Sequence, residues 1–221
     1  MFRNLKVLGL TLIAMLAVSA VAVSAASADL LYGETTPATL TGSQEGTDVL
    51  SVHGGFVKCT TVKYTGTTTA FGMSQITVTP SFSGCTFSGL TATVNMNGCD
   101  YLVQFNLTAG NTTGSTDIVC PFENEITITA PKLGTAKCIV HIPAQFGLGV
   151  GFSGANVGSG ATREVTLKLS YNALRYSQTA GTAETGNCAT ADKTIGGTYE
   201  GRALLTGENA AGTAHVGIFL G

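Results

Sequence analysis

Three histidines are the residues of this chain best suited to acid–base chemistry near neutral pH. They are His53, His141 and His215, and they lie far apart in a sequence of 221 residues. No His-x-His or His-Glu-x-x-His pattern joins them, and no Gly-x-Ser-x-Gly sequence offers a nucleophilic serine. His141 alternates with Val140 and Ile142, so we expect it on the polar face of a strand. The sequence predicts no catalytic residue; if the protein is an enzyme, these histidines, each with a nearby carboxylate, are the best candidates.

Glu123 and Glu125 form a close pair of carboxylates, separated by one residue. Paired carboxylates can cleave glycosidic bonds or bind calcium. No Asp-x-Asp-x-Asp-Gly loop accompanies the pair, and neighbours of this kind in a solvated turn usually do neither. We therefore predict no metal site.

The glycines of Gly149–Gly154 match the spacing of a dinucleotide-binding loop, Gly-x-Gly-x-x-Gly. That motif needs a helix after it to receive the pyrophosphate. The glycine-rich residues 155–160 would break such a helix. We interpret the stretch as a loop and predict no cofactor.

The six cysteines predict three disulfide bonds, because an even number in an exported chain indicates a disulfide framework. No pair has CxxC spacing, which argues against a zinc ribbon. Fifteen pairings are open, and among them we expect Cys59–Cys85, Cys120–Cys138 and Cys99–Cys188. These cysteines are Cys59, Cys85, Cys99, Cys120, Cys138 and Cys188.

The N-terminus has the features of a secretory signal peptide. Arg3 and Lys6 precede an uncharged, mostly apolar stretch, which ends in Ala26-Ser27-Ala28. Signal peptidase accepts small side chains of this kind, so we place the cleavage after Ala28. The alternative is an uncleaved anchor, since residues 7–28 are long enough to span a bilayer. After cleavage we predict no membrane span.

The composition excludes one class of partner. Removal of Arg3 and Lys6 leaves nine basic and thirteen acidic side chains, a net charge of about −4. Nucleic-acid binding needs clustered Lys and Arg, so we predict no nucleic-acid partner.

Alternating apolar and polar residues dominate the rest of the chain. Residues 90–96, 101–107 and 165–169 each place apolar side chains on one face, the period of a half-buried strand. Asn97-Gly98 predicts a turn, because both residues tolerate positive φ. Turn signals between such segments predict about eleven strands in an antiparallel β-sandwich or jelly-roll-like assembly.

The domain organisation is predicted in three parts. They are a signal peptide (1–28), an extended N-terminal segment (29–47) and one β-sandwich domain (48–221). The glycine-rich passage 145–162 leaves a subdivision open.

The cysteine framework resembles that of an uncharacterised group of secreted bacterial proteins with six cysteines. The resemblance rests on six segments that cover most of residues 40–221. They are Gly54–Cys59, Thr79–Cys85, Asn97–Tyr101, Val119–Pro121, Cys138–Gln145 and Tyr199–Gly201. It implies disulfides and β structure, and no activity or functional residue.

We expect a secreted or cell-surface, non-enzymatic module, structural or ligand-binding, whose partner is an unknown extracellular ligand or envelope component. The alternatives are a secreted hydrolase with a site assembled from loops, and an inhibitor or toxin-like effector. A cleft with converging polar groups would favour the hydrolase.

The first prediction concerns export. The exported species is expected to begin at Asp29, because the cleavage rule is met after Ala28. N-terminal sequencing of the exported protein measures this, and an intact Met1 would mean that the segment is an anchor.

Overall fold

The chain is built of antiparallel strands. The computed structural model describes residues 31–33, 38–68, 72–108, 111–131, 137–148, 152–180 and 191–221, which excludes the predicted signal peptide. Within these ranges there are seventeen strands, one 3₁₀ turn (Gly160–Thr162) and no α-helix, hence no helix that could cross a membrane. The antiparallel all-β prediction is confirmed. The strands outnumber the predicted eleven because several have only two or three residues, too few to show a period.

The strands fall into a small and a large sheet. The small sheet contains β17 (Ile218–Leu220), β1 (Leu31–Gly33) and β5 (Gly72–Met73). The others, in chain order, are β2 (Ala38–Gln44), β3 (Asp48–Val52), β4 (Gly55–Thr68), β6 (Gln75–Phe87), β7 (Leu90–Asn95), β8 (Asp100–Thr108), β9 (Asn111–Val119), β10 (Glu125–Pro131), β11 (Lys137–Pro143), β12 (Gln145–Leu148), β13 (Phe152–Val157), β14 (Glu164–Ala180), β15 (Ala191–Asn209) and β16 (His215–Val216).

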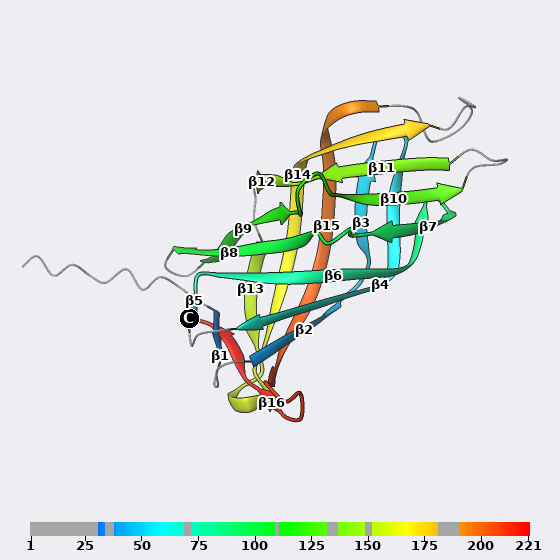
Figure 1. Ribbon diagram of the computed structural model, residues 1–221. Coiled ribbons are helices and arrows are strands. Elements are labelled where there is room, and N and C mark those ends of the chain that lie inside the picture. Colours follow the sequence, from blue (N-terminus) through cyan, green and yellow to red (C-terminus); the bar gives the residue numbers. More distant parts are fainter. Residues whose placement is uncertain are drawn as a thin grey trace, which may run out of the picture.

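The large sheet closes on itself around four long strands. β4 pairs with β6, and β14 pairs with β15. On one side β2 and β3 both bridge β15 to β4. On the other side two series of strands, β8–β9–β13 and β7–β10–β11, bridge β6 to β14. In Figure 1 the steep β13, β14 and β15 cross the flatter β6, β8, β10 and β11, so two layers face each other over a core.

The alternation of buried and exposed residues is broken near the middles of β4 and β6. Two consecutive residues are exposed on each strand, Thr60 and Thr61 on β4 and Ser83 and Gly84 on β6. Gly84 has φ +60°, and a Cβ there would lie 2.0 Å from Thr60 Oγ1. Glycine adopts this φ without strain and leaves room for the Thr60 side chain, which a larger residue would have to displace.

The core follows the predicted alternation. Val165, Leu167 and Leu169 are all buried inside the sheet, as are Val103 and Phe105. The turn at Asn97-Gly98 is also confirmed, since the two residues have φ of 49° and 80°.

The passage 145–162 does not separate two sheets. It contains β12 and β13, which pair with β9, and β13 also pairs with β14. The domain boundaries at 28 and 47 remain predictions.

One predicted disulfide is present. Cys59 and Cys85 are direct partners across β4 and β6, and both are buried. Disulfides are consistent with an oxidising compartment.

A second disulfide corrects the other two predicted pairs. Cys99 is bonded to Cys120, so the predicted bonds Cys120–Cys138 and Cys99–Cys188 are wrong. The reason is the register of the β8–β9 hairpin, in which the residue after Cys99 pairs with the residue before Cys120.

Cys138 is also disulfide-bonded, whereas Cys188 lies outside the described residues. The strand partner of Cys138 is Ala180, eight residues before Cys188, and Ala191 follows three residues after it. We therefore predict a Cys138–Cys188 bond. Non-reducing peptide mapping of the oxidised protein should recover this pair, and free thiol at Cys188 would contradict it.

Candidate functional site

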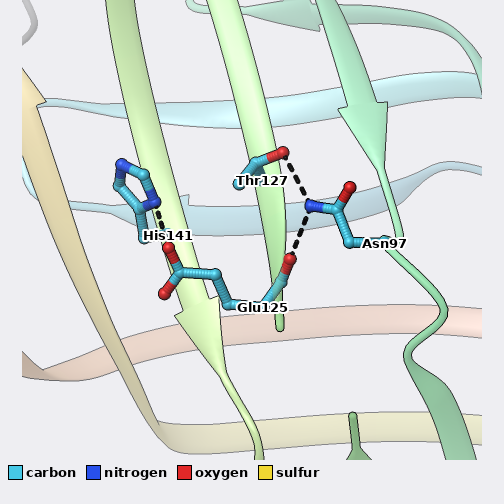
Figure 2. A network of polar contacts seen from close by, with 4 residues as sticks. All are labelled: Asn97, Glu125, Thr127 and His141. Atoms are coloured by element: carbon cyan, nitrogen blue, oxygen red, sulfur yellow. Dashed lines mark hydrogen bonds and ion pairs between the residues drawn. The ribbon is translucent and has the colours of Figure 1, made fainter. Parts of the chain in front are cut away.

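A polar network joins the end of β7 to β10 and β11 (Figure 2). The Nδ1 atom of His141 contacts a carboxylate oxygen of Glu125. The Asn97 amide donates hydrogen bonds to the Glu125 carbonyl oxygen at 2.8 Å and to the Thr127 hydroxyl at 3.3 Å. The structure thus brings together His141 and Glu125, which the sequence offered separately.

Strand register explains this network. Glu125 and Thr127 are two residues apart on β10 and share its outer face, and Thr127 is the direct partner of His141. On β14 the direct partner of His141 is Ser177. His141 faces outward, as predicted, because Val140 and Ile142 occupy the core.

The turn between β9 and β10 is held by two hydrogen bonds and a disulfide. The Asn124 N–H donates to the Pro121 carbonyl at 2.9 Å, and the Asn124 amide donates to the Asn97 carbonyl at 2.8 Å. Cys120, immediately before the turn, is held by its disulfide. Glu123 adopts φ 61°, which is uncommon for a residue other than glycine and persists where the surroundings enforce it.

This turn displays a phenylalanine. Phe122 is 91% exposed, and Val119, at the end of β9, is 38% exposed. Phe146 on β12 is 73% exposed, and the residue before it, Gln145, pairs with Ile118 of β9. We call Val119, Phe122 and Phe146 the aromatic corner; it lies where β9 ends, β10 begins, β11 ends and β12 begins (Figure 1).

Phe146 is held in place by its neighbours. The amide of Gln145 exchanges hydrogen bonds with the backbone of Arg175 on β14, at 2.9 and 3.0 Å. The N–H of Gly147 donates to the buried Asp117 carboxylate at 2.7 Å. The corner is therefore braced at both phenylalanines.

The other predicted candidates are not brought together. His53 lies in the exposed turn between β3 and β4, and His215 pairs with Glu208 at the edge of β15. Within the described ranges no three His, Cys, Asp or Glu side chains are grouped to hold a metal ion. Of Gly149–Gly154, the last residues belong to strand β13 and residues 149–151 lie outside the description.

A second polar group lies inside the closed sheet. The carboxylate of Asp48 accepts hydrogen bonds from Tyr199 at 3.1 Å, Tyr64 at 3.3 Å and the Arg202 N–H at 3.2 Å. Tyr171 stacks on Tyr199 with ring centroids 5.7 Å apart. We call Asp48, Tyr64, Tyr171 and Tyr199 the Asp48 cluster.

Burial dominates the electrostatics of the Asp48 cluster. It raises the pKa of Asp48, and the hydrogen bonds from Tyr199, the Arg202 N–H and Tyr64 oppose it only in part. It also raises the pKa of Tyr64 and Tyr199, further increased by the negative charge of Asp48. The tyrosines are therefore neutral donors.

Gly201 makes room for the Asp48 cluster. A Cβ on this residue would lie 2.6 Å from Asp48 Oδ1 and 2.8 Å from the Tyr199 hydroxyl. A larger residue would displace the carboxylate from its donors.

A comparison with protein-family models, with curated proteins and with solved structures found no match to the chain. The resemblance to secreted six-cysteine proteins therefore remains an expectation.

Sequence reasoning missed Phe122 and Asp48. Asp48 stands in a short alternating segment that gives no sign of a buried acid. Phe122 lies between Pro121 and Glu123, outside any alternating segment, and that was the available signal for an exposed side chain.

Replacement of Asp48 with Asn tests the effect of burial. Because the folded pKa is raised above 3.8, protonated Asp48 contributes stability below that pH, and this contribution is lost as pH rises through the folded pKa. Between pH 3.8 and the folded pKa, the unfolding free energy of the wild type minus that of Asp48→Asn should therefore fall as pH rises. Urea unfolding at a series of pH values measures it, and a difference that grows with pH would show that hydrogen bonding outweighs burial.

Proposed function

We propose that the protein acts outside the cell as a non-enzymatic binding module that contacts its partner through the aromatic corner. The observation that supports this most is Phe122, 91% exposed on a braced turn. Folding gains nothing from an aromatic ring that is left almost wholly in water, since the hydrophobic gain depends on the apolar area that is buried.

The exposed ring of Phe122 can contribute favourable free energy when a partner binds and buries it. Transfer of a phenylalanine side chain from water to an apolar pocket is worth roughly 1.5–3 kcal/mol. Aromatic side chains are frequent among the few residues that dominate interface energies. A partner with an apolar pocket is therefore the kind that Phe122 fits.

The braces of the turn serve the same purpose. Binding costs free energy when a flexible loop must be ordered, and a loop already fixed avoids that cost. The disulfide of Cys120 and the hydrogen bonds of Asn97 and Asn124 order the turn before any partner arrives.

The negative charge of Glu123 beside the Phe122 ring would orient a bound partner. Glu123 is exposed next to Phe122. A positive group at the edge of the partner's pocket would be complementary to it. An envelope component or an extracellular protein with such a pocket is the partner that we propose.

A secreted hydrolase is the second candidate, since the structure places Glu125 on Nδ1 of His141 and Ser177 on the adjoining strand. A carboxylate in this position orients a histidine in Ser-His-Asp/Glu enzymes. These residues, however, lie on the outer face of the sheet, and the two cavities described below lie in its interior.

Phe122→Ser tests the proposed contact. The variant should bind envelope fragments of the producing cells at least about tenfold more weakly than wild type, a loss of about 1.4 kcal/mol. Its unfolding midpoint should not change, because the side chain is already exposed. Sedimentation of fluorescently labelled, oxidised residues 29–221 with these fragments measures the affinity.

Phe56→Ser is the matched control, since Phe56 is 43% exposed at the start of β4 and lies outside the corner. Equal weakening by both substitutions would contradict a specific contact at Phe122. Turnover in a hydrolase panel that disappears in His141→Ala would replace the binding module with an enzyme.

A further inference from the structure

A cavity of about 50 Å³, partly open to its surroundings, lies within the closed sheet beside the Asp48 cluster. Most of its wall is aliphatic, with side chains such as Leu50, Val57 and Ile128. Its polar lining includes Asp48, Thr116 and Tyr171. An apolar space with a few converging polar groups is the usual form of a small-molecule site.

Two hydroxyl groups at this cavity lack a protein partner. Thr116 is 1% exposed and Tyr171 is 5% exposed, and neither side-chain oxygen makes a hydrogen bond to a protein group. Burial raises the pKa of Tyr171, and an interaction with the Thr116 hydroxyl lowers it, so the two hydroxyls face each other, although their oxygens are too far apart for a hydrogen bond of normal length.

Such groups are unusual. Leaving a buried donor or acceptor unsatisfied costs roughly 1–3 kcal/mol, and most buried side-chain polar atoms in folded proteins are satisfied. Asp48 does not supply the missing bond, since its hydrogen bonds go to Tyr64, Tyr199 and the Arg202 N–H and none reaches the Thr116 or Tyr171 hydroxyl.

A second cavity, of about 20 Å³, lies next to the first. Thr116 and Tyr101 belong to the walls of both cavities. The Thr116 hydroxyl is therefore placed where a molecule in either cavity could reach it.

Size and polarity define the ligand. The larger cavity exceeds the ~10–15 Å³ that one water requires and is smaller than the ~150 Å³ that accommodates benzene. The lining contains no cationic side chain, and its one carboxylate, Asp48, is already held by three donors, so a charged ligand is disfavoured. A neutral ligand of a few non-hydrogen atoms that carries at least one hydroxyl group fits these limits.

We propose that this cavity is a binding site for small neutral hydroxyl compounds, whose O–H group bridges the side chains of Thr116 and Tyr171. Water and a short-chain alcohol share this chemistry. The site is independent of the aromatic corner and of any partner bound there.

Thr116→Val and Tyr171→Phe test the proposal, because each removes one hydroxyl with little change of shape. If a ligand bridges the two hydroxyls, each variant should unfold more readily, with an unfolding constant raised roughly tenfold. The double variant should show less than the sum of the two effects, since the second substitution has no bridge left to break.

Two measurements distinguish the occupants in wild-type protein. Titration with 2-propanol should give saturable shifts of the amide resonances of Thr116 and Tyr171, absent in the double variant, if an alcohol binds. Nuclear Overhauser effects between these amide protons and a water molecule of long residence time, without a saturable shift, identify water as the occupant. Variants as stable as wild type or more stable, with neither signal, would overturn the proposal.

Discussion

Hydrogen bonding along β14 is the constraint on which the rest of the molecule depends. One edge of this strand pairs with β15 over most of its length, and the other edge pairs first with β13 and then with β11. β13 and β11 are the last strands of the two series that begin at β6. Their pairing with β14 therefore closes the large sheet, which has an inner and an outer face. Edge strands, which would otherwise be open to other chains, are few as a result.

Closure explains why the interior carries polar groups in a fixed arrangement. A carboxylate that enters a closed sheet must be met there by donors, since water cannot reach it freely. Tyr64 and Tyr199 provide those donors to Asp48, and Gly201 leaves the space that the carboxylate fills. Thr116 and Tyr171 lie on the same wall without such partners, and the cavity is next to them.

Closure also determines what the outside can do. The outer face is rich in Thr and Ser, and its charged side chains are few, so the exposed rings of Phe122 and Phe146 differ sharply from their surroundings. The disulfide between Cys99 and Cys120 joins the two ends of the β8–β9 hairpin. Because Cys120 directly precedes the turn that contains Phe122, the bond also restrains that turn. Glu125, which contacts His141, begins β10 immediately after that turn, so the polar network follows Phe122 closely in the chain.

The sequence by itself determined the local features: alternation along each strand, the turn at Asn97-Gly98, and the β class. These depend on neighbours in the chain. Only the tertiary structure decided which distant residues meet. The bond from Cys99 to Cys120 required the hairpin register, and the contact of His141 with Glu125 required the pairing of β10 with β11. Register is a property of two strands together, since slipping one by a residue turns every side chain to the other face, and one strand's sequence does not contain it.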